Sequence, residues 1–148
     1  MIQVAVSNRQ RSVRVSTARA KRNARRVLLE MGFVKAELSL AFVDDGEMRL
    51  LNATYRRANE ATDVLAFAMG EGRFGSVNPH VLGDVVISTE TAAFQARKGG
   101  RNLSEELDVL LVHGILHLIG YDHERSPSEA RVMRAKEESL RRLLGSLG

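Results

Sequence analysis

The chain has 148 residues, of which 44% are hydrophobic and 27% charged, the composition of an ordinary globular protein with one buried core. It contains no cysteine, which excludes disulfides and thiolate metal sites and fits a reducing, cytoplasmic location. No apolar run approaches the roughly 18 residues of a membrane span, and the N-terminus lacks the apolar core of a signal peptide. We therefore expect a single domain over residues 1–148 and no membrane partner.

The first half of the chain predicts two strands and two helices in alternation. Residues 2–6 and 37–43 have the pattern of strands. Residues 17–31 have helical spacing, with an apolar stripe that consists of Ala20, Ala24, Val27, Leu28 and Met31. Asp44 or Asp45 is placed to cap the second helix.

Cations are concentrated at the N-terminal end of the chain. The net charge is +4, and the first 29 residues contain no acid but the cations Arg9, Arg11, Arg14, Arg19, Lys21, Arg22, Arg25 and Arg26. The spacing of Arg19, Arg22 and Arg26 places them on one side of the predicted helix. Such a run favours a polyanion partner, most simply nucleic acid, over a solvated helix face, and an anionic membrane surface is the weaker alternative. We predict that these three arginines bind RNA phosphates and take no part in the chemistry.

The second half of the chain begins with two short apolar strands. They are predicted at residues 63–67 and 83–87, and the glycine-rich residues 69–82 between them predict a loop. Ser88 or Thr89 begins a helix that runs to about residue 98.

Two further helices complete the predicted fold. Asn102 with Glu105 three residues later is a capping box, which begins the helix that carries the histidines. Pro127 begins a last amphipathic helix that ends near residue 144. The whole pattern predicts an α+β fold, in which a mixed four-stranded sheet is packed with about five helices.

Three histidines within eleven residues are the most informative feature of the chain. His113 and His117 are four residues apart, so they share one face of a helix and can reach one metal ion. Gly120 can end that helix in the left-handed conformation, after which the chain turns back to offer His123. Three neutral nitrogen ligands leave one tetrahedral position open, which is typical of a catalytic Zn²⁺ on a central helix.

Gly114 distinguishes this motif from that of the metzincin proteases. Their spacing is the same, but a glutamate that acts as general base directly follows their first histidine. Glycine has no side chain for proton transfer, which favours a hydrolase with a different substrate. Two alternatives stay open: a non-catalytic RNA-binding assembly factor with a structural metal, and a metallopeptidase whose base lies elsewhere.

Several other polar residues are candidates for the site. Arg56 and Arg57 end the second helix, where they would face phosphodiester oxygens or simply complement the helix dipole. Asp63 and Asp84 would orient a ligand histidine or cap a strand end. The last three candidates are two carboxylates beside the third histidine and one histidine outside the cluster, namely Asp122, Glu124 and His80. The two carboxylates are the nearest in sequence for proton transfer, and we expect His80 to be exposed.

The histidine motif resembles that of a known family. Residues 113–123 (HGILHLIGYDH) are similar to the signature of the YbeY endoribonucleases, the bacterial ribosomal RNA maturation factors. Residues 51–56 (LNATYR) with 62–67 (TDVLAF) resemble the family's segment around its active-site arginine. Residues 82–88 (LGDVVIS) resemble the strand that precedes its next helix. The resemblance covers about residues 36–124.

The resemblance implies particular roles for four residues. It makes His113, His117 and His123 the metal ligands and Arg56 the substrate-positioning arginine, but it gives no role to Arg57. The chain departs from the family pattern at three alanines, where proline, serine and proline are usual: Ala61, Ala66 and Ala68. These departures concern the geometry of loops and not the metal site.

The resemblance also implies an activity and partners. It implies a single-strand-preferring, metal-dependent endoribonuclease that matures the 3′ end of the small-subunit ribosomal RNA and acts in ribosome quality control. The implied partners are small-subunit ribosomal proteins or an assembly GTPase.

Overall fold

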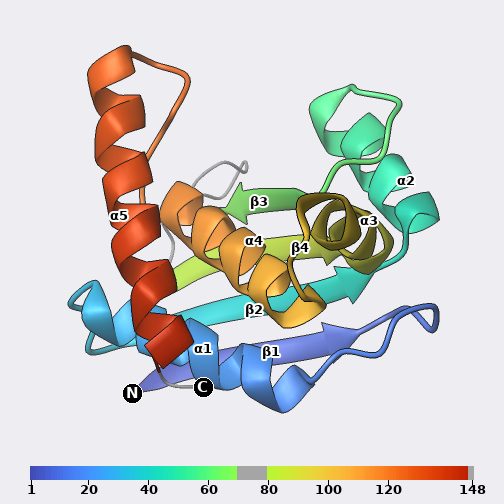
Figure 1. The fold of residues 1–148 in the computed structure, drawn as a ribbon. Helices are drawn as coiled ribbons and strands as arrows, with labels where there is room; N and C mark the ends of the chain where they lie inside the picture. Colours follow the sequence, from blue (N-terminus) through green and yellow to red (C-terminus); the bar gives the residue numbers. More distant parts are fainter. Residues whose placement is uncertain (70–79, 147–148) are drawn as a thin grey trace.

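The computed structural model of the protein describes residues 1–69 and 80–146, and Figure 1 shows how they are arranged. Most of the loop predicted over residues 69–82 therefore lies outside the described residues. The described part corrects the C-terminal end of that loop, because the next strand already begins at Val81. No helix in the described ranges has both the length and the apolar character needed to cross a membrane.

Strands and helices follow one another along the described chain as the sequence predicts. In order they are β1 (Ile2–Asn8), α1 (Thr17–Glu30), β2 (Ala36–Val43), α2 (Asp45–Arg56), β3 (Val64–Ala68), β4 (Val81–Ser88), α3 (Thr89–Gly99), α4 (Leu103–Leu118) and α5 (Pro127–Ser146). The predicted α+β fold is confirmed, and most element bounds differ from the prediction by one or two residues.

The strands form one mixed sheet in the order β1-β2-β4-β3. β1 pairs with β2, and β2 with β4, in parallel, whereas β3 pairs with β4 antiparallel. Within the described sheet β1 and β3 are therefore the edge strands. Ala66 lies opposite Val85 and Phe67 opposite Asp84. Because side chains alternate between the faces of a strand, these two pairs point to opposite faces of the sheet.

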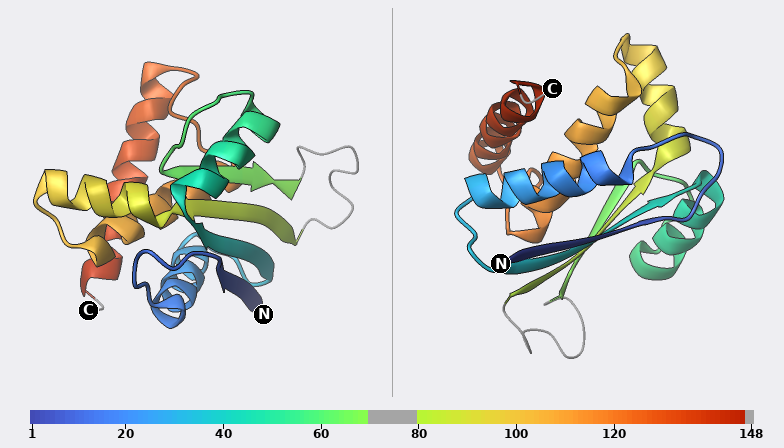
Figure 2. Two further views of the ribbon diagram at one scale, coloured as in Figure 1. Left: turned by 90° about the vertical axis from the view of Figure 1, so that its right-hand side faces the viewer. Right: turned by 90° about the horizontal axis from the view of Figure 1, so that it is seen from below.

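The two faces of the sheet are covered by different helices (Figure 2). α1 and α4 pack on one face, with α5 against α4, while α2 lies on the other face. The main core fills the space between the sheet and α1 and α4, and it includes Val4, Val27, Leu28, Leu38, Leu40, Val85, Ile87, Leu111 and Ile115. A smaller cluster under α2 contains Val43, Met48 and Val86. α4 contacts the sheet and three other helices, which makes it the central helix.

Side-chain caps fix where the helices begin. Asp44, and not Asp45, caps α2 by accepting a hydrogen bond from the backbone N–H of Glu47 at 2.8 Å. Ser88 caps α3. Asn102 and a glutamate three residues later form the predicted capping box of α4. Each cap satisfies a backbone N–H that the first turn of a helix leaves unpaired, which is why short sequence patterns locate these starts so closely.

Candidate metal centre

Three histidine side chains meet at the C-terminal end of α4. His113 and His117 lie one turn apart on the helix, and His123 follows the turn after it. One ring nitrogen of each lies within 4.8 Å of those of the other two. The Nε2 atoms of His113 and His117 are 3.1 Å apart. Two nitrogens bound to one tetrahedral zinc would lie about 3.3 Å apart, so this spacing suits a shared ion.

A glycine turn brings His123 back toward α4. The helix ends at Leu118, and Gly120 takes a φ of 107°, in the left-handed region that glycine favours. The backbone N–H of Tyr121 donates to the carbonyl of Leu116 at 3.0 Å and closes the turn. Gly120 therefore adopts the left-handed conformation that the sequence predicted.

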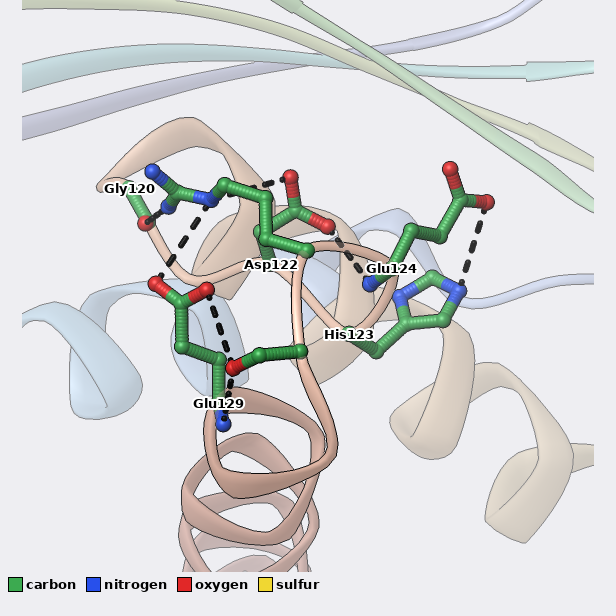
Figure 3. A network of polar contacts seen from close by, with 7 residues as sticks. Gly120, Asp122, His123, Glu124 and Glu129 are labelled. Carbon is green, nitrogen blue, oxygen red and sulfur yellow. Dashed lines mark hydrogen bonds and ion pairs between the residues drawn. The ribbon is translucent and has the colours of Figure 1, made fainter.

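Asp122, labelled in Figure 3, helps to hold the segment that carries His123, and Arg125 contributes to the same network. One carboxylate oxygen of Asp122 accepts from the backbone N–H of Glu124 at 2.7 Å, and the other lies 3.3 Å from Arg125 Nε. Arg125 also donates to the carbonyl of Gly120 at 3.1 Å. The hydrogen bond from Glu124 is the main reason that the pKa of Asp122 lies below its ordinary value. Glu124 itself is exposed, with a carboxylate oxygen 3.7 Å from His123 Nε2.

His113 also contacts a residue that the sequence reasoning missed. Its Nδ1 lies 2.8 Å from Oε2 of Glu137, which is on α5. A carboxylate oxygen accepts hydrogen bonds, so this contact suits the tautomer of His113 in which Nδ1 carries the proton and is the hydrogen-bond donor. In that tautomer the lone pair of Nε2 is directed toward His117, which is the arrangement a metal ligand needs.

The protonation of His117 also suits a ligand. Burial is the main cause that lowers its pKa below the ordinary value, and the neighbouring His113 and His123 lower it further. A lowered pKa favours the neutral ring, the form of histidine that binds metals. Within the described residues the cluster consists of these three histidines, which is a donor set for zinc with one position left for a non-protein ligand.

Gly114 is explained by packing. A Cβ atom at this position would lie 2.6 Å from Cγ1 of Val85 on β4 and 3.2 Å from Cγ2 of Val64 on β3. The helix therefore lies so close to the sheet that the position has no room for a side chain. A glutamate there would point into the core and not toward the histidines. This geometry argues against a metallopeptidase that uses the usual base.

Arg56 lies on a different face of the sheet from the histidines. Its guanidinium donates to the carbonyl of Ala66 at 2.7 Å and lies 4.7 Å from the centre of the Phe67 ring. It lines a cavity of about 760 Å³ on the α2 face, together with Asp84. In the described part of the chain, none of the three clustered histidines lines this cavity. Arg57, in the left-handed conformation, caps the C-terminal end of α2.

The remaining candidates, Asp63, Asp84 and His80, lie apart from the histidine cluster in the structure. Asp63 accepts from the backbone N–H of Val64 at 2.8 Å and from Gln95 at 3.4 Å, so it caps the start of β3. Asp84 is exposed on the α2 face, where partial burial in the cavity raises its pKa. Among the described residues, neither carboxylate makes a hydrogen bond or an ion pair with a clustered histidine. His80 is exposed just before β4, as expected.

The N-terminal arginines divide into two kinds. Arg19 donates to Asp108 on α4 at 2.8 Å, and Asn23 donates to the other oxygen of the same carboxylate at 2.9 Å. Burial raises the pKa of Asp108, and Arg19 and Asn23 oppose that effect. Arg22 and Arg26, by contrast, are exposed on α1. The structure thus separates Arg19, which is partly buried in an ion pair, from the other two members of the predicted RNA-binding face.

The fold and the site define an α+β protein with a candidate three-histidine metal centre on its central helix. Residues 5–145 match the family model described as Endoribonuclease YbeY, and the chain belongs to that family. The resemblance seen in the sequence is therefore confirmed.

Relatives from several bacteria are similar over most of the chain. Endoribonuclease YbeY of Geobacter metallireducens is 46% identical over 140 residues, which cover 94% of this chain and 93% of that one. The Geobacter sulfurreducens protein of the same name is 44% identical over 148 residues and 99% of each chain. That of Aquifex aeolicus is 50% identical over 110 residues, 74% of this chain and 71% of its own. A Thermotoga maritima protein with a known solution structure shares the fold, with a TM-score of 0.64 at 23% identity, over 97% of this chain and 89% of that one.

Proposed function

We propose that this chain, over residues 1–148, is a single-strand-preferring, metal-dependent endoribonuclease that acts in ribosomal RNA maturation, including the 3′ end of the small-subunit RNA, and in ribosome quality control. Its family membership supports the endoribonuclease activity. The observation that carries the metal dependence is the convergence of His113, His117 and His123 on one point, with nitrogens within 4.8 Å of one another.

We infer that His113, His117 and His123 hold one Zn²⁺ through ring nitrogens. A bound zinc supplies Lewis-acid polarisation of a phosphodiester and activation of water at neutral pH. The protein's own residues would do the remaining work. Glu137 holds the His113 ring with its Nε2 lone pair directed at the site. Asp122 and Arg125 hold the turn that presents His123, so that the ligands are positioned before the ion arrives.

Arg56 is proposed to position the substrate by contact with a phosphate. Its guanidinium is held at β3, one of the two edge strands of the described sheet, while the histidine-bearing α4 packs against the other face of the same strand. For Arg56 to contact the RNA that reaches the histidines, the strand of RNA has to pass around the β3 edge. Such a path suits single-stranded RNA, which bends more easily than a duplex.

The cellular setting is proposed from the family resemblance. We propose a cytoplasmic protein that meets the small ribosomal subunit through its ribosomal proteins or through an assembly GTPase. The exposed Arg22 and Arg26 are proposed to contact RNA phosphates.

The alternative of an assembly factor with a structural metal is not favoured. A structural zinc is closed by a fourth protein ligand, and within the described ranges the cluster offers three histidines and no fourth ligand. The family's name points to cleavage as well.

The proposed function is tested by single-strand RNA cleavage and metal analysis of purified protein. Replacing His113, His117 and His123 together by alanine should remove both bound zinc and cleavage. His80→Ala is the matched control, because His80 is the fourth histidine of the chain and lies outside the cluster. Chelation of the wild-type protein should stop cleavage, and added Zn²⁺ should restore it. Unchanged zinc content in the triple variant would refute the ligand assignment, and cleavage by the chelated protein would refute the metal dependence.

A further inference from the structure

α5 presents one charged residue within an otherwise apolar row. Met133, Leu140 and Leu144 are each at most 1% exposed and pack into the main core. Glu137 stands between them at spacings of four and three, so it lies on the same side of the helix. A carboxylate on a core-facing row costs free energy unless it is hydrogen-bonded. Its position therefore calls for a partner, and that partner is His113.

The contact is specific in its atoms. Glu137 Oε2 lies 2.8 Å from Nδ1 of His113, and the two side chains are each about one quarter exposed. A carboxylate oxygen at this distance favours Nδ1 as the donor, so the contact fixes the orientation of the ring and favours the tautomer that leaves Nε2 available to a metal. A negative charge at this place also makes the ring a stronger electron donor.

The next residue along the helix has no such contact. Glu138 pairs with Arg141 at 2.7 Å and with Arg142 at 3.2 Å, both on α5 itself. Glu137 and Glu138 are therefore neighbouring carboxylates of the same helix with different partners. Glu137 contacts a histidine of the candidate metal centre, whereas Glu138 pairs with exposed arginines of α5.

We propose that Glu137 is a positioning residue that sets the metal affinity of the site and couples metal binding to the docking of α5. This role of Glu137 depends on one part of the proposed function, namely that the three histidines bind a metal, and it does not depend on RNA cleavage. α5 is otherwise attached to α4 and α1 through its apolar row. Since His113 binds both the ion and Glu137, each interaction should strengthen the other, because coupling between two binding events is reciprocal.

Zinc affinity, measured by competition with a chromogenic chelator, tests the first half of the proposal. Glu137→Ala should bind zinc about 10–100-fold more weakly, the usual effect of losing a partner of this kind. Glu137→Gln should lose less, because its amide oxygen still accepts from Nδ1 while the charge is gone. Glu138→Gln should bind like the wild type. Wild-type affinity in Glu137→Ala would overturn the proposal, and so would an equal loss in Glu138→Gln.

Hydrogen exchange of the full chain tests the second half. Zinc should slow amide exchange in α5 of the wild type and of Glu138→Gln, but much less in Glu137→Ala. Circular dichroism of the metal-free variants shows whether α5 still folds, and Glu137→Gln keeps the side-chain volume if alanine does not fold. Equal protection of α5 by zinc in Glu137→Gln, Glu137→Ala and the wild type would overturn the coupling.

The two proposals fail in different ways. A wild-type protein that binds zinc but cleaves no RNA would refute the proposed function and leave the role of Glu137 standing. A Glu137→Ala protein with wild-type zinc affinity and normal cleavage would refute only the role of Glu137.

Discussion

Arg19 and Arg22 lie three residues apart on α1 but have different surroundings. Arg19 reaches α4, where it pairs with a carboxylate that is only 10% exposed, whereas Arg22 is exposed. Removing one partner of a partly buried ion pair leaves the other charge without compensation and destabilises the fold. Replacement of Arg19 would therefore mix a loss of stability with any loss of RNA binding. Arg22 and Arg26 are the residues that test the basic face.

Arg22→Gln combined with Arg26→Gln should make RNA affinity less dependent on salt. Each phosphate contact to a single strand contributes roughly 0.7 to the slope of log affinity against log salt, so the double variant should lower the slope by about 1.4. Fluorescence anisotropy with a single-stranded RNA at several salt concentrations measures it. Arg97→Gln with Lys98→Gln, two exposed cations at the end of α3, is the control with the same change in charge. An unchanged slope in the α1 variant would show that this face does not bind RNA.

At the scale of an element, α4 packs closely against the sheet and also carries two of the three clustered histidines. Its buried residues include Leu111 and Ile115, while His113 and His117 on an adjacent stripe are only partly buried. Gly114 permits the approach to β3 and β4, because any Cβ atom there would overlap Val85. The distance between α4 and the sheet is thus set at the residue that directly follows His113.

Gly114→Ala should be about 1–3 kcal/mol less stable than a glycine-to-alanine variant at an open position of a helix, because added atoms in a close-packed core force their neighbours to move. The effect opposes the higher helix propensity of alanine, which by itself favours the variant by about 1 kcal/mol. Urea unfolding measures the difference. Gly145→Ala is the control on α5, since a Cβ atom there meets nothing within 4 Å. If Gly114→Ala gained as much stability as Gly145→Ala, α4 would not lie as close to the sheet as described.

At the scale of the whole molecule, the proposed site has parts on both faces of one sheet. The histidines belong to the α4 face, and Arg56 belongs to the cavity on the α2 face. The edge strand β3 is common to both, because α4 packs on it and Arg56 donates to the carbonyl of its Ala66.

Arg56→Ala should keep the fold and the zinc content but cleave RNA about 10²-fold more slowly, the usual cost of removing one group that stabilises transition-state charge. Single-turnover cleavage, with zinc content measured on the same preparation, tests this expectation. Arg57→Gln is the neighbouring control, because Arg57 is exposed and caps α2. Wild-type cleavage by Arg56→Ala would place the α2 face outside the active site.

The sequence alone was sufficient for features that arise within a few residues. The helix starts at Asp44, Ser88 and Asn102 and the turn at Gly120 follow from backbone hydrogen bonds and dihedral angles close in the chain. The spacing of the histidines indicated their convergence for the same reason, because one helix turn and one glycine turn bring them together. Their role as ligands stays a prediction.

Tertiary structure decided the contacts between residues far apart in the chain. Glu137 lies 24 residues from His113, and Asp108 lies 89 from Arg19, so only the packing of α5 and α1 on α4 brings each pair together. The position of Glu137 in the apolar row of α5 indicated that its carboxylate has a polar partner. The spacing along the helix could not identify His113 as that partner. The separation of Arg56 from the histidines also results from tertiary packing, because α2 and α4 lie on opposite faces of the sheet. A sequence places residues along a strand or helix, whereas the face of the sheet on which a helix packs depends on the whole core.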